Sequence, residues 1–429
     1  MVRAERSSLI EKGMNRKNPQ RIMILLLVLT GLIFLGSYLH KLSEMWGPAT
    51  GMKAGAIYRL DRMGEPIGAD FTLFWAASYL SLTGDPLAVY DFSQLRAAEQ
   101  QVFGPEVDLP WPYPPTFLLM VLPVSLLPYL ASLAIWLCAT LAVYLLVLCR
   151  IGPHPLTFLL TLAFPGTFIN FICGQNGFLA AALLGGGLLL LARCPWTAGM
   201  LLGLLCFKPH LALLVPLALL AGRHWKALMG ALTTAVGLSV ASGLVFGWQV
   251  WAAFWSNLPF AIRLLGNETA PWQKMPSVFA ATMLLGGGFL LAWILQALVM
   301  LSAAAAVAWV WRRGASLPIR SSVLVLGLLL FPAHIFNYDL ALLSLPLSWL
   351  GWEGYQKGWL VGEPSLLILG WVMPLFLLPV RGIELKMPIA PLVLGALLWL
   401  CLRRSIMARR PGNPGMRVNK FKQLCPQNP

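Results

Sequence analysis

The sequence predicts an all-α membrane protein that crosses the bilayer many times. Of its 429 residues, 58% are hydrophobic and only 11% are charged, whereas about a quarter of the residues in a soluble domain are charged. The apolar residues form runs close to the length of a bilayer-spanning helix. Lysines and arginines collect at the ends of these runs, as in cytoplasmic loops. The net charge of +15 therefore does not indicate a nucleic-acid partner.

The first apolar run, residues 22–39, follows a basic segment at residues 1–21. This order is typical of a signal peptide, but residues 36–45 offer no small-x-small cleavage site and the run is long enough to span. We therefore predict an uncleaved anchor that follows a cytoplasmic tail. The basic segment 403–429 predicts a second cytoplasmic tail, so the number of spans should be even.

A membrane domain with about twelve transmembrane helices is expected over residues 22–402. The predicted spans are residues 22–39, 128–149, 156–172, 178–193, 196–207, 210–221, 226–247, 288–311, 319–336, 340–352, 362–380 and 388–402. Several are too short to cross a hydrocarbon core of about 30 Å. The pair 196–207 and 210–221 is therefore also compatible with a hairpin that enters and returns, and residues 116–127 with either a span or a re-entrant segment.

Residues 40–115 are predicted to form an extracytoplasmic loop that carries two helices at the membrane surface. In residues 71–82 apolar side chains recur at helical spacing, which predicts an amphipathic helix. Asp91 followed by Gln94 is typical of a capping box, so a second helix should run from there to Gly104. Prolines in residues 110–115 then stiffen the return to the membrane.

Five motifs, in this order, resemble glycosyltransferase family 87. They are GADFTLFWAASYLSLTGDPLAVYD, PYPPTFLLMVLPVSLLP, GQNGFLAAALL, AGMLLGLLCFKPHLALLVPLALLAGRHWKAL and HIFNYDLALLSLPL, spread over residues 60–350. The resemblance implies a membrane enzyme of the GT-C superfamily, with a GT-C-like bundle, that takes a sugar, mannose by default, from a polyprenyl phosphate. The last motif departs from the family's version, which contains serine and tryptophan.

Asp70 precedes the first loop helix, and its position alone favours a helix N-cap. The alternative is a general base that takes the proton from an acceptor hydroxyl. The resemblance implies the base, because the family's proposed base is the aspartate of this motif. One carboxylate suffices, since a polyprenyl phosphate already leaves as a stable anion and a single displacement inverts the anomeric carbon.

Two further motifs carry candidate contacts for the donor. Lys208, between two apolar runs, either binds the donor phosphate or extends to the membrane interface. In HIFNYD, His334 and Asn337 are candidate phosphate or sugar contacts. Asp339 of the same motif either pairs with His334 or caps the next helix.

The remaining candidates lie in predicted outer loops. Tyr113 is placed where the loop re-enters the membrane, and Gln175 and Asn176 form either a sugar contact or a polar turn. Lys274 and Arg263 either steer an anionic headgroup or are ordinary surface residues. The predicted topology brings the candidate segments to one face of the membrane.

No cofactor and no metal ion are expected, because the sequence has neither a P-loop, nor a GxGxxG pattern, nor metal-ligand spacing. The predicted partners are a polyprenyl-phosphate sugar, a lipid or glycan acceptor and membrane lipids. The alternative function is a multispan transporter or flippase for a lipid-linked substrate. The chain shows no duplicated halves, which favours the enzyme. The predicted location is a bacterial inner membrane, with the site outside.

Overall fold

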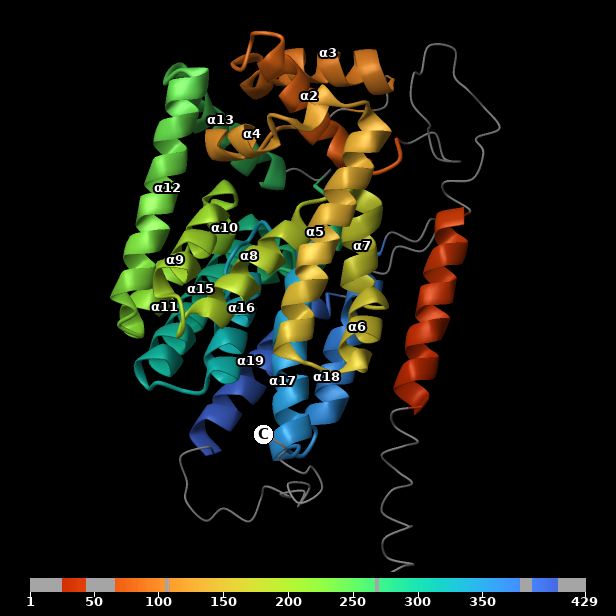
Figure 1. The fold of residues 1–429 in the computed structure, drawn as a ribbon, viewed down its shortest axis with the longest axis vertical. Helices are drawn as coiled ribbons and strands as arrows, with labels where there is room; N and C mark the ends of the chain where they lie inside the picture. Colours follow the sequence, from red (N-terminus) through yellow and green to blue (C-terminus); the bar gives the residue numbers. More distant parts are fainter. Residues whose placement is uncertain are drawn as a thin grey trace, which may run out of the picture.

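The described fold consists of helices (Figure 1). The computed structural model describes residues 25–43, 66–104, 107, 109–266, 270–378 and 388–407, and over 260–266 only the backbone. After a first helix, Leu25–Ser43, come α2 (Phe71–Leu82), α3 (Phe92–Phe103), α4 (Pro115–Val121), α5 (Tyr129–Ile151), α6 (Pro155–Leu162), α7 (Pro165–Cys173), α8 (Gly177–Leu190), α9 (Pro195–Gly203), α10 (Pro209–Ala212), α11 (Leu214–Ala221), α12 (Trp225–Phe246), α13 (Gln249–Gly266), α14 (Val278–Leu284), α15 (Gly288–Arg312), α16 (Leu317–Leu330), α17 (Ser344–Lys357), α18 (Glu363–Val372) and α19 (Ala390–Met407). These residues contain no β-strand, which confirms the predicted all-α class.

Among the described residues, five helices are long and apolar enough to cross a membrane, or six if the bent pair α6–α7 forms one span. The five are Leu25–Ser43, α5, α12, α15 and α19. Each of the other seven predicted spans coincides with a short, bent or broken helix, so the predicted number of about twelve spans is not confirmed. Prolines begin several of the pieces, because proline cannot donate the backbone hydrogen bond that a helix interior needs.

Residues 403–407, predicted as the start of a cytoplasmic tail, belong instead to α19. The reason is a buried ion pair between Arg404 and Glu363, at the start of α18. Arg404 also donates to the carbonyl of Gly358 at 2.9 Å. The predicted tail 1–21 and residues 408–429 lie outside the described residues, as do residues 44–65 of the predicted loop.

Two short helical pieces form a hairpin with Lys208 at its tip. The first is α9 with the 3-10 helix η3 (Leu204–Phe207), and the second is α10 with α11. Each piece has 13 residues, which at 1.5 Å per residue gives about 20 Å, less than a membrane core. Lys208 at the tip is buried, so the hairpin ends inside the bundle. That residues 196–207 and 210–221 enter the membrane and return stays a prediction.

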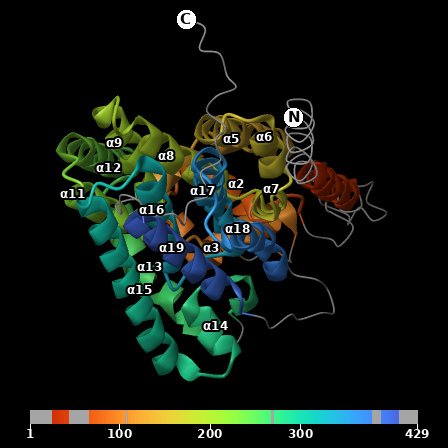
Figure 2. The same ribbon diagram turned by 90° about the horizontal axis from the view of Figure 1, so that it is seen from below.

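Glycines fix this hairpin against α12. A Cβ on Gly199 would lie 2.1 Å from the carbonyl oxygen of Ala227, and one on Gly203 would lie 2.4 Å from that of Ala231. This four-residue glycine spacing allows the two helix backbones to touch. Seen from below, α9, α11 and α12 lie on one side of the molecule and Leu25–Ser43 lies on the other, near α6 (Figure 2).

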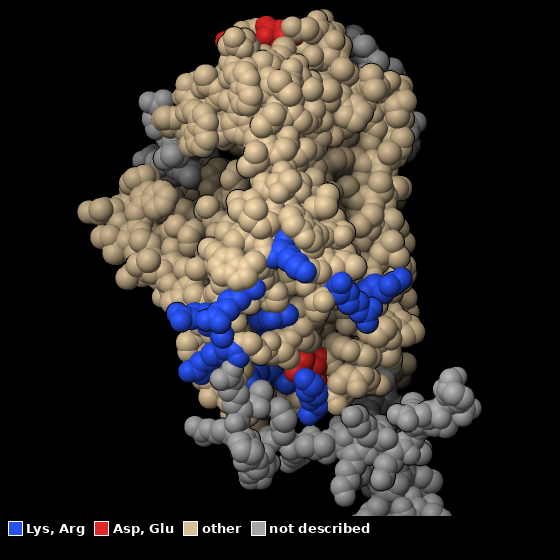
Figure 3. Space-filling view, turned by 60° about the vertical axis from the view of Figure 1, so that its left-hand side comes forward, with Lys and Arg blue, Asp and Glu red and all other residues tan. Residues whose placement is uncertain are grey.

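On the face shown in Figure 3, basic side chains form a belt near one end of the molecule. Its members lie at helix ends, among them Arg150 in the last turn of α5, Arg193 after α8, Lys226 in α12, Arg312 in α15 and Lys357 in α17. Helices α2, α3 and α4 cover the opposite end (Figure 1). The molecule therefore has the charge asymmetry that accompanies a fixed orientation in a membrane.

The two loop helices have the predicted bounds, but the first is not amphipathic. Helix α3 begins at Asp91, whose carboxylate accepts from the amides of Ser93 and Gln94, and it ends at Gly104. In α2, all residues from 71 to 78 are buried, because α3, α4 and the aromatic side chains between them enclose it on every side. The prediction of a surface amphipathic helix at 71–82 was therefore wrong.

Candidate active site

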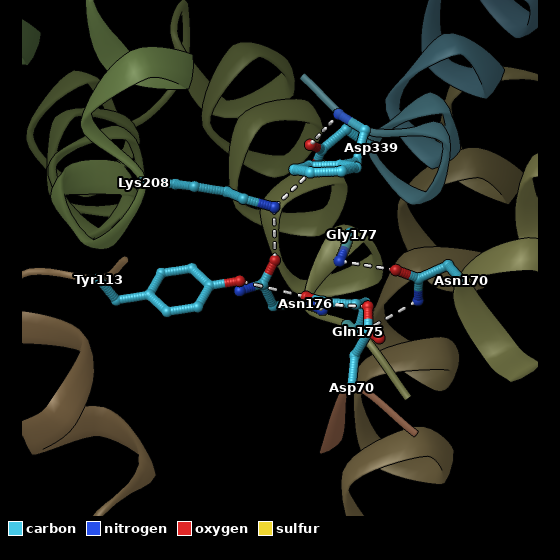
Figure 4. Close-up of polar contacts among 9 residues, drawn as sticks. Asp70, Tyr113, Asn170, Gln175, Asn176, Gly177, Lys208 and Asp339 are labelled. Carbon is cyan, nitrogen blue, oxygen red and sulfur yellow. Dashed lines mark hydrogen bonds and ion pairs between the residues drawn. The ribbon is translucent and has the colours of Figure 1, made fainter. Parts of the chain in front are cut away.

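Polar side chains from five distant segments form one hydrogen-bonded network inside the bundle (Figure 4). The segments are the residue before α2, the approach to α4, the turn between α7 and α8, the tip of the α9–α11 hairpin, and the 3-10 helix η5 (Asn337–Leu343). Their members are Asp70, Tyr113, Gln175, Asn176, Lys208 and Asp339. The structure thus brings together six of the eight predicted site residues.

Asp70 is half-buried and its side chain does not cap α2. Its Oδ2 instead accepts a hydrogen bond from the Gln175 side-chain amide at 3.1 Å. The preceding loop is held by the Tyr129 hydroxyl, which donates to the carbonyls of Ile67 and Gly68. Burial raises the pKa of Asp70, while Gln175 and nearby lysines partly offset this. Such a carboxylate is a stronger base than a solvent-exposed aspartate.

Gln175 connects the carboxylate to the rest of the network. Its Oε1 accepts from the Tyr113 hydroxyl at 3.3 Å and from the backbone amide of Asn176 at 3.1 Å. The turn around it is stabilised by Asn170, which donates to the Gln175 carbonyl at 3.2 Å and accepts from the Gly177 amide at 2.8 Å. Sequence reasoning missed Asn170, although an amide inside an apolar run was a usable signal.

Lys208 is 2% exposed and does not extend to the membrane interface. Its ammonium group donates to Asp339 Oδ1 at 2.5 Å and to Asn176 Oδ1 at 2.7 Å. The Tyr338 ring lies 5.0 Å away, at a cation–π distance. Asp339 is therefore paired with Lys208 rather than with His334, and its second oxygen accepts from the Phe336 amide at 3.3 Å.

Two glycines explain the GQNG motif. Gly174 has φ +68, a conformation that favours glycine, and a Cβ there would lie 2.8 Å from Phe71 Cβ. A Cβ on Gly177 would lie 2.5 Å from Asn170 Oδ1 and 2.6 Å from the Tyr338 carbonyl. The turn is therefore packed between the Asp70 loop and η5, which holds the two halves of the network together.

We expect Gly177→Ala to destabilise the protein by about 1–3 kcal/mol, because the added methyl meets backbone that cannot rotate away. It should also lower turnover, since Asn176 and Gln175 must shift. Thermal unfolding in detergent and a sugar-transfer assay will measure both effects. Gly351→Ala in α17 is the control, because a Cβ there meets no atom within 4 Å. Equal behaviour of the two variants would contradict this role.

Two predicted site residues make no hydrogen bond to the network. Asn337 donates to the carbonyl of Leu377 at 3.0 Å, toward the 3-10 helix η6 (Met373–Leu377). The His334 ring packs against Phe336, with 5.1 Å between ring centroids. Burial lowers the pKa of His334 to about 4, so the ring is neutral at pH 7 and offers no positive charge to a phosphate.

Two other polar groups lie near the network. The Nδ2 of Asn176 is buried and has no hydrogen-bond partner among the described residues. Lys274, in the 3-10 helix η4 (Trp272–Lys274), is exposed, and its charge acts on Asp70. In the part of the chain that the structure describes, no group of three His, Cys, Asp or Glu side chains could hold a metal ion.

The fold and the site together are those of a membrane protein whose helical bundle encloses a network of amide and ionisable side chains, as an active site within a membrane requires. Residues 111–332, more than half of the chain, match glycosyltransferase family 87. The chain belongs to this family and is a membrane glycosyltransferase, as the sequence motifs predicted. Tyr113, Gln175, Asn176 and Lys208 lie inside the matched range. Neither a curated protein nor a solved structure matches the chain.

Proposed function

We propose that the protein transfers a hexose, mannose-like, from a polyprenyl phosphate to a lipid or glycan hydroxyl. The reaction takes place on the extracytoplasmic face of a bacterial inner membrane and inverts the anomeric carbon. The observation that carries this proposal is a half-buried carboxylate with a raised pKa, fixed by an amide network at the tips of short helices. Family membership supplies the reaction class.

Asp70 acts as the general base. Gln175 holds its Oδ2, while Oδ1 makes no hydrogen bond with the described residues and is free to accept the proton of an acceptor hydroxyl. As the proton moves to Asp70, the acceptor oxygen attacks the anomeric carbon and the bond to the phosphate breaks. The phosphate leaves as an anion, so no second carboxylate is needed to protonate it.

The leaving phosphate is stabilised by lysine charge and by amide groups. Lys274, exposed beside Asp70, attracts the donor headgroup, and the buried Lys208 adds positive charge while Asp339 holds it in place. Asn176 Nδ2, which has no hydrogen-bond partner among the described residues, donates to a phosphate or sugar oxygen. Such donors favour the transition state, in which negative charge develops on the phosphate.

The remaining predicted contacts have secondary roles in this proposal. Tyr113 and Gln175 border the sugar and orient Asp70. The neutral His334 donates a hydrogen bond to the substrate. Asn337 acts indirectly, because its amide is engaged by Leu377 and fixes the backbone of η5.

A transfer assay tests the activity itself. Purified protein, given a radiolabelled polyprenyl-phosphate sugar and membrane acceptor lipids, should form labelled product without any nucleotide sugar. Movement of the donor across vesicle membranes without product would favour the transporter alternative. Failure to use the lipid donor, together with transfer from a nucleotide sugar, would overturn the proposed donor.

The orientation in the membrane is tested by labelling at Ala97. This residue is exposed on α3, whereas Glu99 in the same helix is buried. An Ala97→Cys variant in a background without other cysteines should react with an impermeant maleimide in intact spheroplasts. Arg150→Cys, in the basic belt at the other end, should react only after permeabilisation. The reverse pattern would place the site in the cytoplasm.

A further inference from the structure

A second cluster of functional groups lies at the basic end, far from the network around Asp70. It is formed where the α11–α12 turn meets the start of α16. The guanidinium of Arg320, which is half-buried, lies 3.2 Å from the imidazole Nε2 of His224 and over the ring of Trp311. The Trp311 indole in turn donates to the Arg320 carbonyl at 3.0 Å. These contacts hold the guanidinium in one place.

Arg320 has no counter-ion among the described residues. The two described glutamates of this end are engaged elsewhere, Glu353 with Lys357 and Glu363 with Arg404. The Nε of Arg320 is buried and has no hydrogen-bond partner in the described part of the chain. A partly buried charge without an opposite charge is unfavourable. The cluster therefore lacks an anion.

The His224 ring does not supply this anion, but it leaves the charge of Arg320 intact. Burial and then the charge of Arg320 lower the pKa of His224. The ring is therefore neutral at pH 7, so its nitrogen accepts a hydrogen bond from Arg320 without adding a second positive charge. The two groups thus form a fixed donor surface with a net charge of one.

The turn next to His224 presents more positive charge at the same place. Arg223 has φ +56 and is the one non-glycine residue with positive φ in the described part of the chain. A Cβ on Gly222 would lie 2.9 Å from Trp311, so the turn is pressed against that ring. Arg223 is exposed. Its guanidinium group therefore adds a second positive charge to the turn that carries His224.

We propose that His224, Trp311 and Arg320, together with Arg223, form a binding site for the phosphate of an anionic lipid headgroup. Guanidinium groups bind phosphate oxygens through charge-assisted hydrogen bonds, and basic sites between helices near the membrane surface suit such headgroups. Trp225, the first residue of α12, is 58% exposed beside this turn. An exposed tryptophan at a helix end marks headgroup depth, which favours a lipid over a soluble phosphate.

Native mass spectrometry of the full-length protein in detergent tests the site, with phosphatidylglycerol, phosphatidylcholine and inorganic phosphate as separate probes. Wild-type protein should bind phosphatidylglycerol in preference to phosphatidylcholine. Arg320→Gln should weaken this binding by about 10-fold, the effect of losing a charge-assisted contact. Arg150→Gln is the matched control, because Arg150 is an exposed arginine in the same belt, at the end of α5. It should bind as wild type does.

A second variant, Arg223→Gly, tests the site in case Arg320→Gln does not fold. Arg223→Gly places glycine at a positive φ, so its thermal midpoint should not fall, while its affinity for phosphatidylglycerol should. Unchanged affinity in Arg320→Gln, or in Arg223→Gly if the first variant does not fold, would overturn the site. An equal loss in Arg150→Gln would show belt-wide attraction instead. Equal binding of inorganic phosphate would overturn the assignment to a lipid.

Discussion

Asp70→Asn will lower turnover by about 10²–10⁴-fold, the range for loss of a positioned base, without loss of folded protein. Asparagine keeps an oxygen that can accept from the Gln175 amide, but it cannot take a proton at neutral pH. Because the Asp70 side chain caps no helix amide, its replacement should not affect α2. Donor binding should survive, since the proposed phosphate contacts lie on other residues.

The measurement is the single-turnover transfer rate across pH. Wild-type rate should fall as pH drops through the pKa of Asp70, which burial raises above the usual aspartate range, and this dependence should be absent in the variant. Asp91→Asn is the control, because hydrogen bonds from Ser93 and Gln94 lower the pKa of that exposed cap to about 2. A near-wild-type rate for Asp70→Asn would eliminate the proposed base.

Lys208→Met will destabilise the protein by about 3–5 kcal/mol, because Asp339 then remains buried without its partner. Adding Asp339→Asn removes the unpaired charge, so the double variant should recover most of this loss. The sequence predicted a lysine that either extends to the membrane interface or binds the donor phosphate, and in the second case loss of donor use would exceed loss of stability. Because Lys208 forms a buried ion pair, we expect loss of stability to be the larger effect in Lys208→Met.

A double-mutant cycle by chemical denaturation in detergent measures the coupling between the two residues. Additive effects of the two single variants would contradict the ion pair. The double variant also tests the proposed phosphate role separately from folding. If Lys208 contributes charge to the donor, the folded double variant should show a donor KM raised by about 10-fold or more. An unchanged KM would leave Lys208 with a structural role alone.

Capping residues in the sequence predicted the ends of the loop helices well. Hydropathy predicted the number of membrane spans poorly. Asp91 and Gly104 fixed the ends of α3, because a cap is a property of a few neighbouring residues. Periodicity failed for α2, because Thr72, Ala76 and Ala77 on its second face are small enough to be buried as well. Hydropathy identified the apolar segments, but it does not report at what depth a short helix ends.

The sequence predicted which residues form the candidate site better than it predicted which of them contact one another. Family motifs pointed to Asp70 and Lys208, which do join one network. The pairing of Lys208 with Asp339 spans 131 positions of sequence, and no local pattern encodes such a contact. The hydrogen bond of the Asn337 side chain could not be predicted from the sequence either, since its partner is a backbone carbonyl on η6.

The aromatic side chains that pack beside the network affect the choice between sugar transfer and hydrolysis of the donor. A carboxylate that activates a sugar hydroxyl can equally activate water, and hydrolysis would then waste the lipid-linked donor. Phe74, Trp111 and Phe117 pack against one another and against the ring of Tyr113, and all three are nearly without exposure. The faces of these rings offer a water molecule few hydrogen-bond partners. An acceptor, in contrast, can pack its own apolar surface against them. In the proposed reaction, these rings would thereby favour glycosylation over hydrolysis.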